Sequence, residues 1–448
     1  MCVEDGNMPF PRAFARAPVH IQGLTVTVPA FSTLGLSEAL LRVLESENYT
    51  QPTPIQVQTI PLILSGRDVL GIAQTGTGKT AAFGLPLLQR LAENRKPPVP
   101  NSARALILAP TRELAIQISQ SLKIYGKPYS YRQAIVMGGV SSHGQIQTMR
   151  NGVDILIATP GRLLDLVKQK AIRLDQVSML VVDEADRMLD MGFIRDVRRI
   201  VQALPRQRQS LLFSATMPED VVHLAHEMLH QPVRVDVAPP TVTADRIEQR
   251  LFHVQAQDKR KLLVDLLHDP KLARVIVFTR TKHGANKVVE HLDKAGIPAD
   301  AIHGNKSQNA RQRAMENFRS GRARLLVATD IAARGIDVDG ITHVVNFELP
   351  NEAESYVHRI GRTARAGAEG IAISFCAPDE RGYLRDIERL VKRKLTVVGE
   401  EPAIVSHGKP AAPVRDYAKK TPFNKRKRGK YNGNNNSNSN RSSSRRAA

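Results

Sequence analysis

Short apolar runs alternate with longer amphipathic stretches along most of the chain. This alternation is typical of parallel α/β proteins, in which buried strands are joined by helices that cover the sheet. The strands expected in the first half are residues 68–72, 106–108, 134–136, 155–157, 180–182 and 211–213.

The pattern pauses near residues 237–241, where Ala-Pro-Pro-Thr follows a valine, and then restarts. The strands expected in the second half are 275–278, 325–327, 343–345 and 371–373. We therefore expect two α/β domains, each built on a parallel sheet. The predicted organisation is an N-terminal disordered extension (1–28), a first domain (29–238), a linker (239–246), a second domain (247–398) and a disordered basic tail (399–448).

Almost every strand predicted in the first half leads into a polar or glycine-containing motif. Ligands of parallel sheets bind outside the carboxyl ends of the strands. Most of the candidate functional residues should therefore lie at one edge of one sheet. The motifs are Ala-Pro-Thr-Arg-Glu at 109–113, Gly-Gly at 138–139, Ala-Thr-Pro-Gly-Arg at 158–162, Asp-Glu-Ala-Asp at 183–186 and Ser-Ala-Thr at 214–216.

The first motif with a specific chemistry is Ala-Gln-Thr-Gly-Thr-Gly-Lys-Thr at 73–80. Backbone N–H groups of such a glycine-rich turn can wrap a polyphosphate, Lys79 can reach the β and γ oxygens, and the Thr80 hydroxyl can hold Mg²⁺. The strict pattern has glycine where this chain has Ala73, so a simple strand-to-helix turn is the alternative. The candidate nucleotide-binding residues here are Ala73, Gln74, Thr75, Gly76, Thr77, Gly78, Lys79 and Thr80.

The second motif is an apolar run, 178–182, that breaks into Asp-Glu-Ala-Asp. A buried strand would bring Asp183 to the metal ion and Glu184 to the attacking water. Taken alone, the motif could be an ordinary solvated strand end. Together with the glycine-rich turn it predicts a site for NTP hydrolysis, with Mg²⁺ as a cofactor and Thr80 and Asp183 as metal ligands.

Arginines recur every three residues at 359, 362 and 365 in the second half. Such a stripe on a helix is ordinarily a solvated basic face. Hydrolysis, however, needs positive charge against the γ-phosphate, and the phosphate site has no arginine of its own. We therefore expect the nucleotide to bind between the two domains, with arginine fingers supplied by the second.

The net charge of +21 is unevenly distributed. From residue 402 onward the chain has twelve lysines and arginines and one acidic residue, which gives +11 in its last tenth. A Lys-Arg cluster at 425–428 is followed there by an Asn/Ser run, a composition that cannot bury a core. Such a tail suits polyanion binding by counterion release, although it could also serve solubility alone.

Two cysteines cannot form a disulfide framework, which fits a reducing cytoplasm. No apolar run approaches the length of about 20 residues that spans a bilayer. Residues 6–30 contain Arg12 and Arg16 and no acidic residue, so a transit peptide is an alternative to a disordered extension or a start at Met8. We expect a cytoplasmic monomer without a membrane partner.

With these motifs the chain resembles the DEAD-box RNA helicases, and is most similar to the bacterial RhlE type. The resemblance covers about residues 31–395. It includes Tyr-Thr-Gln-Pro-Thr-Pro-Ile-Gln at 49–56, which matches the Q motif of the family, with Phe31 upstream of it. It implies two tandem RecA-like domains of the P-loop NTPase class, with the nucleotide in a cleft between them.

The resemblance also assigns roles around the nucleotide. It implies that Gln56 binds the adenine edge and that Phe31 stacks on the ring, which would make ATP the preferred nucleotide. Catalytic roles are implied for Lys79, Asp183, Glu184, Arg362 and Arg365, and ribose binding for Asp337 in Ala-Arg-Gly-Ile-Asp at 333–337. Residues implied to couple hydrolysis to strand separation are Asp186, Ser214, Thr216 and His358.

RNA is the partner that the resemblance implies, held across both domains with little sequence specificity. Glycines and backbone amides approach a sugar-phosphate chain without reading bases, and only the 2′-OH and A-form shape distinguish RNA from DNA. Ribosomal RNA and the mRNA-decay machinery are candidate partners. The residues implied to bind RNA are Arg112, Gly138, Gly139, Thr159, Arg162, Gln308, Arg311 and Thr329.

Two positions depart from the family pattern, with Asn48 and Ala364 standing where glycine is usual. If φ is positive at Ala364, the methyl group should cost about 1 kcal/mol. Two rival functions remain. One is a two-lobe DNA helicase. The other is an RNA clamp or annealing factor, in which the basic tail binds the RNA and ATP hydrolysis only sets when the RNA is released.

Overall fold

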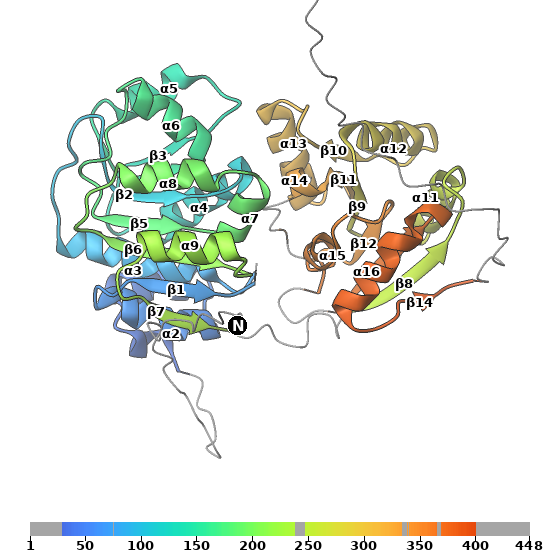
Figure 1. Cartoon of the computed structure of the whole chain (residues 1–448), viewed down its shortest axis with the longest axis horizontal. Coiled ribbons are helices and arrows are strands. Elements are labelled where there is room, and N and C mark those ends of the chain that lie inside the picture. Colours follow the sequence, from blue (N-terminus) through green and yellow to red (C-terminus); the bar gives the residue numbers. More distant parts are fainter. Residues whose placement is uncertain are drawn as a thin grey trace, which may run out of the picture. The chain divides into compact units, whose positions relative to one another are not determined.

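A computed structural model describes residues 29–74, 76–237, 247–333, 338, 340–364 and 369–399. They form two lobes, the first within 29–237 and the second within 247–399, each built on a seven-stranded parallel sheet (Figure 1). The predicted fold class, two tandem RecA-like parallel-sheet domains, is confirmed. The predicted N-terminal extension, linker and basic tail lie almost wholly outside the described residues, and the domain boundaries stay predictions.

The sheet of the first lobe has the strand order β3-β4-β2-β5-β6-β1-β7. Its central strands β2, β4, β5 and β6 are buried at every position, as expected for a sheet covered by helices on both faces. The strands are β1 (Val69–Ile72), β2 (Ala103–Leu108), β3 (Gln133–Val136), β4 (Val153–Ala158), β5 (Met179–Val182), β6 (Gln209–Ser214) and β7 (Val233–Asp236).

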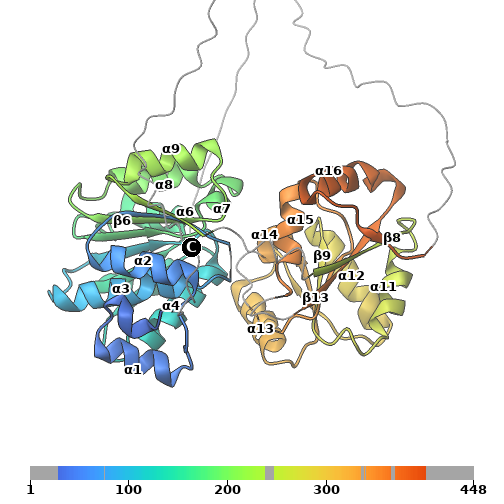
Figure 2. The same cartoon turned by 90° about the horizontal axis from the view of Figure 1, so that it is seen from below.

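Helices cover both faces of this sheet, and Figure 2 shows α2, α3 and α4 on the face opposite α8 and α9. Side chains alternate between the faces along each strand. Leu211 packs in the cluster that contains α2–α4, whereas Leu212 packs with α8 and α9. The helices are η1 (Phe31–Leu34), α1 (Glu38–Ser46), α2 (Pro54–Leu64), α3 (Lys79–Glu93), α4 (Arg112–Tyr125), α5 (Ser142–Met149), α6 (Pro160–Lys168), α7 (Ala185–Asp190), α8 (Ile194–Gln202) and α9 (Glu219–Met228).

The sheet of the second lobe has the order β10-β11-β9-β12-β13-β8-β14. The same alternation divides its core, with Val275 and Val277 in one cluster and Ile276 and Phe278 in another. The strands are β8 (Ile247–His253), β9 (Val275–Thr279), β10 (Asp300–Ile302), β11 (Leu325–Thr329), β12 (His343–Asn346), β13 (Gly370–Cys376) and β14 (Thr396–Val397). The helices are α11 (Lys259–Leu267), α12 (Lys282–Lys294), α13 (Gln308–Arg319), α14 (Asp330–Ala333), α15 (Ala353–Ile360), η2 (Pro378–Glu380) and α16 (Arg381–Val391).

Every strand expected from the apolar runs overlaps an observed strand, and the ends differ by at most three residues. The pattern missed β7, β8, β10 and β14, of which β7, β10 and β14 are edge strands. β7 and β14 also have exposed positions. Edge strands lack the continuous apolar run that identifies a buried strand. Within the described ranges, no helix combines the length and apolar content needed to cross a bilayer.

Candidate nucleotide and RNA site

The strand order of the first lobe brings the nucleotide motifs together. Strands β5, β6 and β1 are neighbours, and all three run parallel. Asp183 follows β5, Ser214 ends β6, and the glycine-rich loop follows β1. Because the carboxyl ends of parallel strands share one edge, these three motifs lie side by side.

The glycine-rich loop has the backbone that its glycines predict. Gly76 and Gly78 have φ of +83° and +87°, a conformation that glycine adopts without strain. α3 begins directly at Lys79, so the free N–H groups of its first turn face the loop, which favours an anion there. Thr77 closes the turn by donating to the carbonyl of Gln74, 2.7 Å away. Thr75 lies outside the described residues.

Lys79 is buried and donates from Nζ to the carbonyl oxygen of Ala73, 2.8 Å away. Ala73 itself is bonded to β6 through its N–H and the Ser214 carbonyl. The lysine therefore reaches back across its own loop and is held over the space that the loop encloses. Thr80 follows in the first turn of α3, where its hydroxyl is an oxygen donor of the kind that Mg²⁺ prefers.

Asp183 is buried at the end of β5. The pKa of its carboxyl group is raised to about 7, chiefly by burial; the Lys79 ammonium group lowers this pKa and the nearby Glu184 carboxylate raises it. A buried carboxylate with this cost of ionisation is well suited to a divalent cation, which would stabilise its charge. Asp183 and Thr80 thus fit the predicted Mg²⁺ site.

Glu184 has φ of +54° and ψ of +53°, in the left-handed region, where it caps the start of α7. Its N–H donates to the Asp183 carboxylate at 3.0 Å. Strained backbone at a residue that is not glycine is retained where the surroundings impose it, often at functional sites. This left-handed residue ends the extended course of β5 and starts α7.

A residue that the sequence interpretation missed lies against Glu184. Arg187 donates from Nη1 to the Glu184 carboxylate at 3.0 Å, and both side chains are almost fully buried. The spacing of three residues at a helix start was the available signal, since side chains so spaced share a helix face. Arg187 fixes the orientation of the predicted general base.

Gln56 and Phe31 lie on the α2 side of the loop. Gln56 accepts from the Thr53 N–H (2.9 Å) and donates to the Gly78 carbonyl (3.1 Å), which ties the Q motif to the phosphate loop. Phe31 is buried in the core of the first lobe, in η1. Binding of adenine by these two residues stays a prediction.

The predicted coupling residues of the first lobe form a hydrogen-bonded cluster. The Asp186 carboxylate accepts from the N–H of Ala215, from the N–H of Thr216 (3.0 Å) and from the Thr216 hydroxyl (3.1 Å). The Asp186 N–H donates to Ser214 Oγ, which donates to the Thr216 carbonyl. The end of β6 is thereby fastened to the start of α7.

The RNA-binding candidates of the first lobe gather at the ends of β2, β3 and β4, which are also neighbours in the sheet. Arg112 starts α4 and lies over the glycine pair: a Cβ on Gly139 would be 2.2 Å from Arg112 Nη1. Thr159 precedes α6, and Arg162 donates to the Val140 carbonyl at 3.0 Å. The predicted nucleotide residues and the predicted RNA residues thus lie on different halves of the sheet edge, which we name the nucleotide half (ends of β5, β6 and β1) and the RNA half (ends of β2, β3 and β4).

The second lobe has a similar arrangement. Gln308 and Arg311 lie in the first turn of α13, which follows β10, and Thr329 ends the neighbouring strand β11. His358 lies in α15, and Arg362 lies just after it and donates from Nε to the His358 carbonyl. Asp337 and Arg365 lie outside the described residues.

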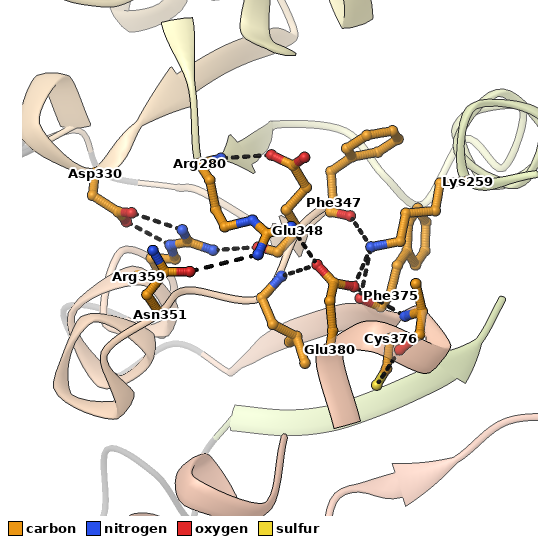
Figure 3. A network of polar contacts seen from close by, with 12 residues as sticks. Lys259, Arg280, Asp330, Phe347, Glu348, Asn351, Arg359, Phe375, Cys376 and Glu380 are labelled. Atoms are coloured by element: carbon orange, nitrogen blue, oxygen red, sulfur yellow. Dashed lines mark hydrogen bonds and ion pairs between the residues drawn. The ribbon is translucent and has the colours of Figure 1, made fainter. Parts of the chain in front are cut away.

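The arginine stripe is not one exposed basic face. Arg359 has a nearly buried side chain and pairs through Nε and Nη2 with the Asp330 carboxylate at 2.5 and 2.7 Å. Its Nη1 donates to the Asn346 side chain. The same Nη1 also donates to the Glu348 carbonyl, as Figure 3 shows. Arg359 therefore anchors α15, and the sequence interpretation did not distinguish it from its two neighbours in the stripe.

Comparison with known proteins agrees with this geometry. The family model of the DEAD/DEAH box helicase matches residues 53–224, and that of the helicase conserved C-terminal domain matches residues 258–367. The DEAD-box ATP-dependent RNA helicase CshA of Bacillus cereus is 45% identical over 82% of this chain and 69% of its own length. The chain belongs to the DEAD-box ATP-dependent RNA helicase family.

Further similar proteins support the family and correct its subtype. ATP-dependent RNA helicase CshA of Listeria monocytogenes is 44% identical over 82% of this chain and 69% of its own. These relatives carry the CshA name, so the expected RhlE type is not supported. The helicase is also similar to the structure of S. cerevisiae Dbp5 bound to RNA and ADP BeF3, with a TM-score of 0.73, 31% identity and coverage of 82% and 95% of the two chains.

Proposed function

We propose that this helicase hydrolyses ATP at the nucleotide half of the sheet edge and uses the cycle to separate short RNA duplexes. The single observation that carries the proposal is the division of one edge between two sets of residues. The ends of β5, β6 and β1 carry the hydrolytic groups, and the ends of β2, β4 and β3 carry glycines and arginines suited to a phosphate backbone.

In this proposal the loop and the first turn of α3 bind the phosphates, with Lys79 at the β and γ oxygens. Thr80 and Asp183 would hold Mg²⁺, whose charge would stabilise the negative charge of the phosphates. Glu184, oriented by Arg187, accepts a proton from the attacking water. Arg362 and Arg365 act as fingers from the second lobe, and Asp337 binds the ribose.

RNA is gripped through its backbone by Arg112, Gly139, Arg162 and the candidates of the second lobe, so binding depends little on base sequence. Recognition of the 2′-OH excludes DNA. The Asp186–Ser214–Thr216 cluster joins the ends of β5 and β6 within the nucleotide half, and in this proposal it is the route by which hydrolysis changes the RNA grip. Binding of both substrates across two lobes implies an open–closed equilibrium that each substrate shifts.

The experiment that tests this function is the steady-state ATPase rate without nucleic acid, with structured RNA and with matched DNA. Glu184→Gln is the blank. We expect strong stimulation by RNA alone and no turnover by the blank. Equal stimulation by DNA, or none by either nucleic acid, would overturn the proposal.

The basic tail supports a second activity, annealing of RNA strands by charge neutralisation, because it holds +11 of the net charge. Deleting 402–448 separates the two activities. We expect the deletion variant to keep RNA-stimulated hydrolysis with weaker RNA affinity and to lose annealing. Loss of stimulated hydrolysis would favour the clamp or annealer instead. Binding to ribosomal RNA or the mRNA-decay machinery, a monomeric state and a cytoplasmic location stay predictions.

A further inference from the structure

Three consecutive residues after β12 are held by charged side chains from distant parts of the second lobe (Figure 3). The Phe347 carbonyl accepts from Lys259 Nζ at 2.9 Å. The Glu348 carbonyl accepts from Arg359 Nη1 at 2.6 Å, and the Leu349 N–H donates to Glu380 Oε1 at 3.3 Å. We name residues 347–349 the anchored segment.

Lys259 and Glu380 also pair with each other, and their side chains are only 4% and 1% exposed. Lys259 begins α11 and Glu380 ends η2, so the pair joins two elements that flank the anchored segment. Burying two charges costs several kcal/mol each, and well-packed apolar side chains often give equal or greater stability. Stability alone therefore does not account for a charged pair here, whereas a fixed geometry does.

The side chain of Glu348 is fixed as well. Its Oε2 accepts from the Arg280 N–H at 2.7 Å. Arg280 in turn lies 3.4 Å from Glu380 Oε1 and stacks over the Tyr383 ring at 5.7 Å. The turn after β9, the anchored segment and the start of α16 are thus tied into one unit around Glu380.

This unit determines where Arg359 lies. The Glu348 carbonyl binds Arg359 on the side of the guanidinium group away from Asp330, so the arginine is held between the two acceptors (Figure 3). Arg359 is in the last turn of α15, three residues before Arg362. A displacement of the anchored segment would therefore move the end of α15 and Arg362 with it.

We propose that Lys259 and Glu380 are positioning residues for hydrolysis: through the anchored segment and Arg359 they place the arginine finger Arg362. This inference rests on the proposed function of Arg362. A finger is worth about 10³–10⁵ in rate, and a misplacement of about 1 Å can cost about a hundredfold. Loss of the pair should therefore slow hydrolysis without weakening nucleotide binding, which is assigned mainly to the first lobe.

The test is a double-mutant cycle on the full-length chain, with RNA-saturated kcat, KM for ATP and the melting temperature as readouts. The variants are Lys259→Met, Arg362→Gln and both together. Lys294→Met is the matched control, because this lysine is 73% exposed and forms its ion pair with Glu290 of its own helix. We expect Lys259→Met to lower kcat about tenfold or more, to change KM less than about twofold, and to have almost no further effect when Arg362→Gln is present.

An equal loss of kcat from Lys259→Met in both backgrounds would overturn the inference, because a general structural defect acts independently of the finger. An unchanged kcat in Arg362→Gln alone would instead refute the finger role in the proposed function. Should Lys259→Met fail to fold, Glu380→Gln takes its place in the same cycle with the same expectations. Lys259→Arg, which keeps the charge, should recover most of the lost rate.

Discussion

Replacing Ala364 by glycine should stabilise the second lobe. Ala364 has φ of +55°, in the left-handed region. From the sequence we expect the alanine methyl group to destabilise the protein if φ is positive here, and φ is positive. The turn cannot relax easily, because the preceding residue is held and β13 lies close by. Thr363 is buried and bonded to the Ile341 and Thr342 carbonyls, and a Cβ added to Gly370 would lie 2.8 Å from the Ala364 nitrogen.

The magnitude follows from two opposing effects. A left-handed backbone costs alanine about 1–2 kcal/mol. Glycine loses about 0.4–1 kcal/mol more conformational entropy on folding than alanine does. The net gain for Ala364→Gly is then about 0.5–1 kcal/mol, which corresponds to a rise of about 1–4 °C in the melting temperature of a lobe of roughly 150 residues.

Circular dichroism should follow the unfolding, since the chain has no tryptophan. Ala314→Gly is the matched control, because Ala314 lies in the middle of α13, where glycine costs about 1 kcal/mol. Ala364→Val should destabilise, because a branched side chain is strained at positive φ. RNA-stimulated kcat should not fall in Ala364→Gly. Destabilisation by Ala364→Gly of the same size as by Ala314→Gly would refute a left-handed backbone at Ala364.

Three further predictions concern the first lobe. Arg187→Met should slow single-turnover ATP hydrolysis about tenfold or more, with little change in KM, because Glu184 loses the ion pair that orients it. Gly139→Ala should weaken RNA binding about tenfold, measured with a fluorescent RNA, because its Cβ displaces Arg112. Asn48→Val should lower the free energy of unfolding by about 1–2 kcal/mol and Asn48→Gly should leave it nearly unchanged, because φ there is +58°.

Each of these has a result that would contradict it. Full activity of Arg187→Met would mean that Glu184 is oriented by its backbone alone. A lower ATPase rate of Gly139→Ala in the absence of RNA would show that the effect is not confined to the RNA half of the edge. Equal stability of Asn48→Val and Asn48→Gly would mean that the turn before the Q motif tolerates side-chain branching.

Much of the fold and of the site edge could be predicted because the relevant signals are local. An apolar run followed by a polar motif indicates a buried strand and its carboxyl end, and the parallel arrangement then gathers Asp183 and Ser214 at one edge. The destabilisation expected from the Ala364 methyl group could likewise be predicted from the residue type and the family pattern alone.

The contacts that the sequence did not predict join residues far apart in the chain. Lys259 and Glu380 are 121 positions apart, and Arg359 and Asp330 are 29 apart. Neither pair leaves a periodic signal, because each partner lies at the end of a different element. Arg187 lies only three positions after Glu184. Their pairing nevertheless depends on the left-handed turn at the start of α7, which residue types alone do not indicate.

The division of the sheet edge has a consequence for inhibitors. The groups assigned to phosphate chemistry and those assigned to the sugar-phosphate chain occupy different strand ends of the same rigid sheet. A compound bound in the loop between β1 and α3 would block ATP hydrolysis. It would leave Arg112 and Arg162 free to bind the RNA backbone. Because each substrate shifts the proposed open–closed equilibrium, such a compound would leave the enzyme held on its RNA if it favours the closed state, whereas a compound at the ends of β2, β3 and β4 would release the RNA.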